Sequence, residues 1–177
     1  MNDLSQAARR HVVTWEDPAT AAKAGLARDG IDYLRAIQRG ELPAPPIANL
    51  LDMRIETVEP GRAVFVCVPQ EFHYNPIGVV HGGVAATLLD TAMACAVHSV
   101  LPAGSGYTTL ELKVNFVRGL TVQSGRVRAE GTLIHMGHRV ATAEGRLTAE
   151  DGRLYAHATT TCMIFGPAGD PPSGDRR

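Results

Sequence analysis

The sequence has no excess of charge of either sign. Its 177 residues include 17 Lys and Arg against 18 Asp and Glu, a formal net charge of -1, and the basic residues are scattered along the chain. Proteins that bind a nucleic-acid backbone or an anionic membrane usually concentrate positive charge. The composition therefore argues against nucleic acids and membranes as partners.

Aromatic residues and cysteines are also scarce. Aromatics make up 5% of the chain, so Val, Leu and Ala must fill most of the interior. The three cysteines, Cys67, Cys95 and Cys162, lie in apolar runs without a paired spacing, which predicts buried free thiols. The first ten residues lack the apolar core of a secretion signal, so we expect a cytoplasmic protein.

The first 46 residues differ in pattern from those that follow. Asp17-Pro18 opens a stretch with helix-start signals and glycine breaks, which predicts one or two short helices. Pro43, Pro45 and Pro46 then predict a stiff linker. We therefore expect three parts: a helical extension with its linker over residues 1–46, a folded domain over 47–166, and a disordered tail over 167–177.

A long apolar helix is predicted after Gly83. Residues 84–100 include five alanines and no glycine or proline, and Pro102 follows as a stop signal. The segment would be about 25 Å long, which is too short for a comfortable bilayer span, and it contains Asp90. A helix that is apolar nearly all round should instead be buried within a soluble fold.

Strand patterns flank this helix on both sides. Alternation places Leu110, Leu112, Val114 and Phe116 on one dry face of a strand. Many inward positions of the later strands are Ala or Gly, which lets a helix lie close to a sheet. The pattern predicts an α+β fold, with a long central helix held by a strongly curved antiparallel sheet. The predicted strands cover residues 53–58, 63–68, 109–116, 126–131, 141–147 and 154–165.

Two features of the helix could carry chemistry. Gly82-Gly83 at its start leave backbone N–H groups open to close approach, as in an oxyanion or anion site, although a tight turn alone would also use them. Asp90 is a carboxylate in a largely buried helix, which is costly unless it reaches solvent, is paired or is used. Gly82 and Asp90 lie about 12 Å apart along the helix, so one copy cannot place both beside the same carbonyl. Two antiparallel copies related by a two-fold axis could do so.

Polar residues near these positions are further candidates. Asn75 could hold a substrate amide or a water molecule, or form only a turn with the proline that follows it. His81 is expected to orient the loop by hydrogen bonding rather than to transfer protons. Thr108 and Thr109 begin the alternating strand, and the hydroxyl of either could position water.

The other histidines indicate no second site. His135 and His138 are three residues apart but lack a third ligand, so we expect no metal. His73, His98 and His157 are expected to pack in the interior or lie at the surface. No G-x-S-x-G elbow offers a serine nucleophile, and no glycine-rich nucleotide motif indicates a bound cofactor.

The segment Asn75-Pro76-Ile77-Gly78-Val79-Val80-His81-Gly82-Gly83, followed by Asp90, is similar to a known pattern. It resembles the N-x-x-G-x-x-H-G-G-x6-D pattern of hot-dog-fold acyl-CoA thioesterases of the phenylacetate-degradation (PaaI-like) type. Residues 115–118 and 137–141 are similar to later strands of that family, and the resemblance covers about residues 47–165. The resemblance implies a hot-dog fold and a thioesterase activity, in which the enzyme hydrolyses an aryl or short- to medium-chain acyl-CoA to free acid and CoA.

The resemblance also implies roles for individual residues. Asp90 matches the catalytic carboxylate, acting as nucleophile or as base for water, and Gly82 matches the backbone N–H that polarises the thioester carbonyl. Asn75 matches an amide that holds substrate or water, and Thr109, with Thr108 as the alternative, matches a hydroxyl that orients water. His81 completes the expected catalytic set. In the family these groups come from two subunits of a homodimer, and dimers commonly pair into tetramers.

The phosphates of coenzyme A need cationic or N–H partners. Arg118 at a strand end and Arg139 in the turn after Gly137 are candidates, together with His138 and the backbone of Gly83. The leading alternative is a non-catalytic protein of the same fold that binds or senses acyl-CoA, because a fold alone does not fix a function. A hydratase or dehydratase ranks third, since the expected acidic residue before the asparagine loop is missing.

Overall fold

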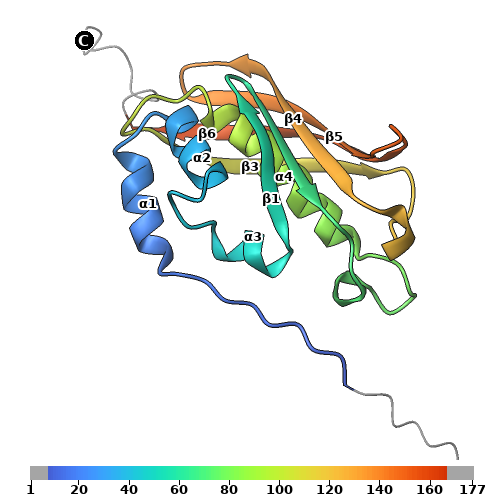
Figure 1. The fold of residues 1–177 in the computed structure, drawn as a ribbon. Coiled ribbons are helices and arrows are strands. Elements are labelled where there is room, and N and C mark those ends of the chain that lie inside the picture. The colour runs from blue at the N-terminus through green and yellow to red at the C-terminus, as the bar shows by residue number, and fades with distance from the viewer. Residues whose placement is uncertain (1–7, 167–177) are drawn as a thin grey trace, which may run out of the picture.

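One long helix, α4 (Gly82–His98), lies along a six-stranded antiparallel sheet that curls around it (Figure 1). This arrangement, seen in a computed structural model that describes residues 8–166, confirms the predicted α+β architecture. The tail expected over residues 167–177 lies outside the described residues. The strands are β1 (Met53–Glu59), β2 (Arg62–Cys67), β3 (Gly106–Phe116), β4 (Val127–Met136), β5 (Val140–Ala149) and β6 (Leu154–Phe165), in the spatial order β1-β2-β4-β5-β6-β3.

Both ends of α4 are held by hydrogen bonds. At the start, the Nδ1 atom of His81 accepts a hydrogen bond from the Gly83 N–H at 2.9 Å, so His81 caps the helix. At the end, the Ser99 hydroxyl donates to the Ala96 carbonyl at 2.7 Å and accepts from the Gly61 N–H at 2.8 Å. The helix therefore begins and ends two residues earlier than the apolar pattern predicts.

Small residues allow α4 to lie directly on the sheet. A Cβ atom added to Gly131 of β4 would lie 2.3 Å from the backbone of Ala92, and one added to Gly145 of β5 would lie 2.9 Å from Met93 Cγ. These contacts explain why glycine occupies inward positions of β4 and β5, as the sequence pattern indicates. The three cysteines, Cys67, Cys95 and Cys162, are buried and form no disulfide bond, as predicted.

Strand β3 departs from the predicted alternation. Thr109 pairs with Cys162, whereas Glu111 pairs with Thr161, so Leu110 is an extra residue in a β-bulge. Leu110 is 55% exposed and Phe116 is 58% exposed. The prediction of one dry face was therefore wrong at these two positions. The bulge turns Leu110 outward, whereas Phe116 keeps the phase of Leu112 and Val114 but is exposed as the last residue of β3.

Three short helices precede the sheet: α1 (Pro18–Leu26), α2 (Gly30–Gln38) and α3 (Pro46–Leu50). The Asp17 carboxylate caps α1 by accepting a hydrogen bond from the Ala19 N–H at 2.9 Å. The predicted proline linker is shorter than expected, because Pro46 is the first residue of α3, a position that suits the fixed backbone angle of proline. Figure 1 shows α2 and α3 beside β1, one of the two edge strands.

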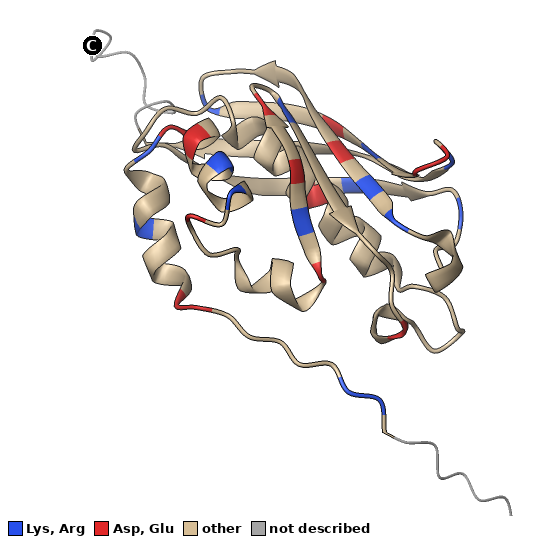
Figure 2. Ribbon diagram, viewed as in Figure 1, with Lys and Arg blue, Asp and Glu red and all other residues tan. Residues whose placement is uncertain are grey.

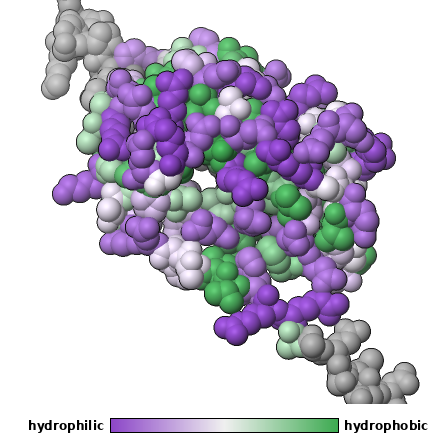
Figure 3. Space-filling view, in the orientation of Figure 1, coloured by the Kyte–Doolittle hydropathy of each residue, from purple (hydrophilic) through white to green (hydrophobic). Residues whose placement is uncertain are grey.

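The surface carries charges of both signs. In Figure 2, basic and acidic residues are interspersed over the strands and helices. Ion pairs such as Arg62 with Glu130 at 2.6 Å and Arg128 with Glu56 at 2.6 Å connect different strands. Polar residues dominate the face seen in Figure 3, where hydrophobic residues form only separate small groups. Within residues 8–166, no helix has both the length and the hydropathy needed to cross a membrane.

Candidate active site

Helix α4 borders two separate cavities. The first, of about 400 Å³, contains Asp90 and is here termed the Asp90 cavity. The second, of about 310 Å³, contains Gly82 at the start of the helix and is termed the Gly82 cavity. One protomer therefore divides the predicted catalytic residues between two places, with Asp90 and Thr109 in one and Asn75, His81 and Gly82 in the other.

The Asp90 cavity follows one stripe of α4. Thr91, Ala94, Cys95 and His98 recur at the spacing that puts residues on one helix face, and all four line the cavity. The edge strands β1 and β3 line it from two further sides, and the N-terminal helices α2 and α3 contribute the remaining wall. Small side chains at the middle of the stripe leave the space open. With Phe65 of β2, six elements assemble the cavity, and their residues range from Tyr33 to Thr109.

Asp90 is held by β3. The Thr109 hydroxyl donates a hydrogen bond of 2.9 Å to Oδ1 of the half-buried Asp90 carboxylate. Tyr107 and Thr109 are two residues apart, so both point to the same side of the strand and into the cavity, whereas Thr108 is exposed. Of the two threonines that the sequence leaves open, Thr109 is the one beside Asp90.

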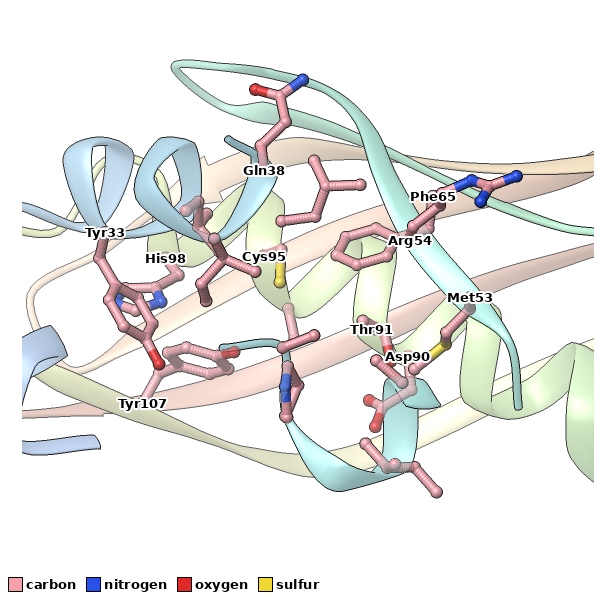
Figure 4. A pocket seen from close by; sticks show the side chains of 18 of the residues that line it. Tyr33, Gln38, Met53, Arg54, Phe65, Asp90, Thr91, Cys95, His98 and Tyr107 are labelled. Carbon is pink, nitrogen blue, oxygen red and sulfur yellow. The ribbon is translucent and has the colours of Figure 1, made fainter. Parts of the chain in front are cut away.

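The other end of the Asp90 cavity is aromatic and polar. The His98 ring lies 5.6 Å from the Tyr33 ring and 5.2 Å from the Tyr107 ring, measured between centroids. Figure 4 shows these three side chains together at one end and Asp90 at the opposite end. Burial lowers the pKa of His98 and raises the pKa of Tyr107 well above its ordinary value, so both are uncharged at neutral pH.

Cys95, between the two ends, is not a nucleophile. Burial raises the pKa of its thiol to about 12, so the thiol stays protonated at neutral pH. Its small side chain instead lines the middle of the cavity. Asp90 is the one carboxylate among the described residues that line this cavity, and a carboxylate is a group that can attack a carbonyl or accept a proton from water.

The Gly82 cavity is formed by a loop that the Asn75 side chain holds in shape. Its Oδ1 atom accepts hydrogen bonds from the Ile77 N–H at 3.1 Å and the Val79 N–H at 3.2 Å. The Nδ2 group of Asn75 has no hydrogen-bond partner within residues 8–166, and Asn75 lines the cavity. Asn75 thus shapes the turn through its Oδ1 atom and leaves its Nδ2 group as a hydrogen-bond donor toward the cavity.

The start of α4 provides a free backbone donor. Because His81 caps the Gly83 N–H, a Cβ atom at Gly83 would lie only 2.9 Å from His81 Nδ1. The neighbouring Gly82 N–H has no acceptor in the part of the chain that the structure describes. It lies at the positive end of a 17-residue helix, so it can stabilise negative charge that develops on an oxygen.

The predicted coenzyme-binding residues are dispersed. Arg118 lines the Gly82 cavity. Gly137, His138 and Arg139 form the turn between β4 and β5, where the Gly137 N–H donates to the Val140 carbonyl at 2.9 Å, and they line neither cavity. Within one protomer, the structure does not bring this turn together with Asp90 or Gly82.

Three cavity residues escaped the sequence analysis: Tyr33, Tyr107 and His98, which was expected to be a packing or surface residue. His73 is buried and His157 is exposed, in line with that expectation. The helical spacing of His98 with Thr91 was a usable signal, because it places His98 on one stripe with residues close to Asp90. No pattern could show that Tyr33, from a separate helix, would reach the same cavity.

Known proteins resemble this chain in sequence and in fold. The model of the thioesterase superfamily matches residues 77–156. A protein of Saccharolobus solfataricus that is named as an esterase is 31% identical over 134 residues, which cover 76% of this chain and 94% of that relative. A 1,4-dihydroxy-2-naphthoyl-CoA hydrolase of Listeria monocytogenes is 26% identical over 118 residues, covering 67% of this chain and 94% of the relative.

A solved structure supports the same assignment. The phenylacetic acid degradation-related protein of Ralstonia eutropha is 34% identical, with a TM-score of 0.67 and coverage of 74% of this chain and 98% of that one. The residues that the family model matches include all of α4, β3, β4 and β5. The chain belongs to the thioesterase superfamily, and it is a thioester hydrolase with a hot-dog fold.

Proposed function

We propose that the substrate is an acyl-CoA with an aryl or a short- to medium-chain acyl group, hydrolysed to free acid and CoA as in PaaI-like thioesterases. The observation that carries the proposal is the Asp90 carboxylate, held by Thr109 at one end of a cavity of about 400 Å³. A cavity of that size lies within the range of small-molecule sites. The hydrolase of Listeria monocytogenes, whose name states a naphthoyl-CoA substrate, supports a CoA thioester.

In the proposed reaction, the Gly82 N–H donates a hydrogen bond to the thioester carbonyl oxygen and stabilises its negative charge in the transition state. Asp90 either removes a proton from the attacking water or attacks the carbonyl carbon itself, and in the second route water then hydrolyses the resulting anhydride to free acid and regenerates Asp90. The Thr109 hydroxyl orients the carboxylate and the water. The carbon–sulfur bond breaks, and the CoA sulfur leaves as a thiolate that takes up a proton. Asn75 and His81 hold the loop and present the Asn75 amide to the substrate.

Each active site is proposed to combine two copies of the chain. Gly82 and Asp90 are eight positions apart on one helix, about 12 Å, and they line different cavities. The edge strand β3 exposes Leu110 and Phe116, and Val117 follows it, which suits an apolar interface with a second copy. A two-fold axis would then form two equivalent sites, and pairs of dimers would form a tetramer.

The coenzyme is assigned to the outside of this composite site. Arg118 in the Gly82 cavity is the proposed cationic partner of the CoA phosphates, with Arg139, His138 and the backbone at Gly137 and Gly83 as further contacts. We further propose that the protein acts in the cytoplasm, where acyl-CoA is made and consumed, and that it needs no metal or other cofactor.

The proposal is tested with a panel of short-, medium- and long-chain and aryl acyl-CoAs, followed by Asp90→Asn on the best substrate. Turnover should fall at least about a hundredfold, because an essential base or nucleophile is lost. Asp17→Asn is the matched control, since Asp17 is exposed on α1 and asparagine is an equally good helix cap. Unchanged hydrolysis by Asp90→Asn would reject the assigned role, and hydrolysis of no acyl-CoA by the wild type would favour a binding or sensor function.

A further inference from the structure

The segment before α1, residues 8–17, is bound to the loop that leads into α4. The Asn49 side-chain amide of α3 donates a hydrogen bond to the Thr14 carbonyl at 2.9 Å, and the Arg9 guanidinium pairs with the Glu71 carboxylate. Glu71 begins η1 (Glu71–His73), a short 3-10 helix that immediately precedes the loop. In Figure 1 the segment runs from α1 toward this loop. A segment that lies outside the region matched by the family model is thus placed beside one half of the candidate site.

A third cavity, of about 970 Å³, lies between the segment and the loop and is here termed the Arg10 cavity. It adjoins the Gly82 cavity, since Tyr74 lines the Arg10 cavity and the next residue, Asn75, lines the Gly82 cavity. The Tyr74 hydroxyl accepts a hydrogen bond from the Val122 N–H at 3.0 Å, which connects two walls of the Arg10 cavity. Consecutive residues are about 3.8 Å apart, so a ligand held in the Gly82 cavity has only a short distance to cross to reach the Arg10 cavity.

The Arg10 cavity presents a cation, an aromatic surface and a hydroxyl donor. In Figure 2 the described segment ends in a basic stretch, of which the exposed Arg10 forms no ion pair within residues 8–166. The His11 ring stacks on the Phe72 ring, with 3.8 Å between centroids and 17° between planes, and both residues are exposed. The Tyr74 O–H has no acceptor in the same part of the chain. A guanidinium and a hydroxyl suit a phosphate, and a stacked ring suits a nucleobase.

Coenzyme A carries groups of these kinds at the end remote from its sulfur. Beyond a diphosphate it ends in an adenosine whose ribose bears a 3′-phosphate. The pantetheine arm between the sulfur and the diphosphate is about 15 Å long when extended, because three bonds of an extended chain cover about 3.5 Å. A thioester whose carbonyl lies at the Gly82 N–H can therefore extend its arm past Asn75, and the wall of the Arg10 cavity begins one residue away, at Tyr74.

We propose that the Arg10 cavity binds the adenosine 3′-phosphate end of CoA, with Arg10 on the 3′-phosphate and the adenine stacked on the exposed face of the His11 ring. The proposal rests on the acyl-CoA hydrolysis proposed above and names the part of the chain that recognises the coenzyme. Glu71, the one carboxylate among the described residues of the lining, is neutralised by its pairing with Arg9. Arg118, in the Gly82 cavity, is left for the diphosphate. The copy of the chain that supplies the Gly82 N–H would then also hold the nucleotide.

The test compares thioesters of one acyl group with CoA, with dephospho-CoA, which lacks the 3′-phosphate, and with pantetheine, which lacks the whole nucleotide. For the wild type, KM should be about tenfold lower for the CoA thioester than for the dephospho-CoA thioester, and highest for the pantetheine thioester, with similar kcat values. Arg10→Gln should raise KM for the CoA thioester about tenfold and leave the other two near wild type. Arg28→Gln, at an exposed position between α1 and α2, is the matched control.

A second pair of variants tests the stacking of the adenine. His11→Ala removes the ring, so KM should rise about fivefold for both thioesters that carry the nucleotide and stay unchanged for the pantetheine thioester. His11→Phe keeps a ring on which the adenine can stack, so KM should stay within about twofold of the wild type for all three. If His11→Ala leaves all three KM values unchanged, the adenine does not stack there and that part of the inference is wrong.

The outcomes separate this inference from the proposed function. If Arg10→Gln changes all three thioesters by the same factor, or lowers kcat and leaves KM unchanged, the segment only holds the loop, and the inference is wrong while the hydrolase remains. Dissociation constants of free CoA and dephospho-CoA, measured by calorimetry, need no turnover. An inactive wild type would therefore still decide the inference: a preference for CoA that Arg10→Gln removes supports it, and equal binding of the two, or a preference that survives Arg10→Gln, overturns it.

Discussion

The two cavities along α4 are built in different ways. In the Gly82 cavity the donor groups are local, because Asn75, His81 and Gly82 come from one short loop that runs into the helix, and residues 116–120 with Tyr155 form the other wall. The Asp90 cavity is assembled by α2, α3, β1, β2, α4 and β3, whose residues span much of the chain. The first cavity supplies backbone and amide donors and the second supplies a carboxylate and an enclosed space. Neither cavity alone contains what hydrolysis of a thioester requires.

The largest expected effect comes from removing the backbone donor of the Gly82 cavity. Gly82→Pro deletes this N–H, and the fold should tolerate it, since Gly82 is the first helical residue and the backbone of His81 is extended, as a residue before proline requires. We expect kcat to fall about 100- to 1,000-fold, the usual cost of losing an oxyanion donor. Steady-state kinetics on the best acyl-CoA, with melting temperatures as a check on folding, measure the effect.

Gly82→Ala is the control for this substitution. It adds a Cβ atom 3.2 Å from the end of the Phe116 ring, as proline does, but it keeps the N–H. Its kcat should fall less than about tenfold, because the neighbouring ring can shift by a few tenths of an ångström. Equal losses for the alanine and proline variants would mean that crowding, and not the N–H, explains the effect.

The difference between the cavities also explains what the sequence could predict. The loop before α4 is contiguous, so its spacing is visible, and Gly83 is required by a contact with His81 only two residues away. The helix and the small residues beneath it follow from local composition in the same way, as Gly131 illustrates. Family resemblance supplied the role of Asp90, and the spacing argument supplied its separation from Gly82.

What the sequence could not provide depends on contacts between distant elements. The bulge at Leu110 arises from the pairing of β3 with β6, and it decides that Thr109 rather than Thr108 meets Asp90. Tyr33 reaches the cavity only because α2 is fixed to the loop after α4. The sequence analysis predicted a linker where α3 begins at Pro46. A proline at the first position of a helix cannot be distinguished by sequence alone from a proline in a linker.

A smaller effect is expected within the Asp90 cavity, from Thr109→Val. The substitution keeps the shape of the side chain but removes the hydroxyl that donates to Asp90 at 2.9 Å, so kcat should fall about tenfold. Thr109→Ser should retain most of the activity, and Thr108→Val on the exposed side of the same strand should have no effect on kcat. If Thr108→Val were the more damaging change, the assignment of the two threonines would be reversed.

The smallest effect concerns stability and pH. Burial lowers the pKa of His73 and of His98 below the ordinary value of 6.5, so the unfolded chain binds protons at these residues at a higher pH than the folded chain does. Their contribution to the free energy of unfolding is complete above about pH 6.5 and is lost as the pH falls below it. Urea unfolding of His98→Phe should therefore show a smaller loss of stability than the wild type between about pH 7.5 and about pH 5.5. An equal loss in both proteins would show that His98 does not contribute.

The most direct test of the account mixes two inactive chains. Asp90→Asn and Gly82→Pro variants with different tags are co-expressed, and the mixed assemblies are purified through both tags. If each site takes Gly82 from one copy and Asp90 from the other, one site of a mixed dimer is intact, and activity should return to about a quarter to a half of the wild-type rate. If both residues act within one chain, every site carries a defect and the mixed assembly stays as inactive as its parents.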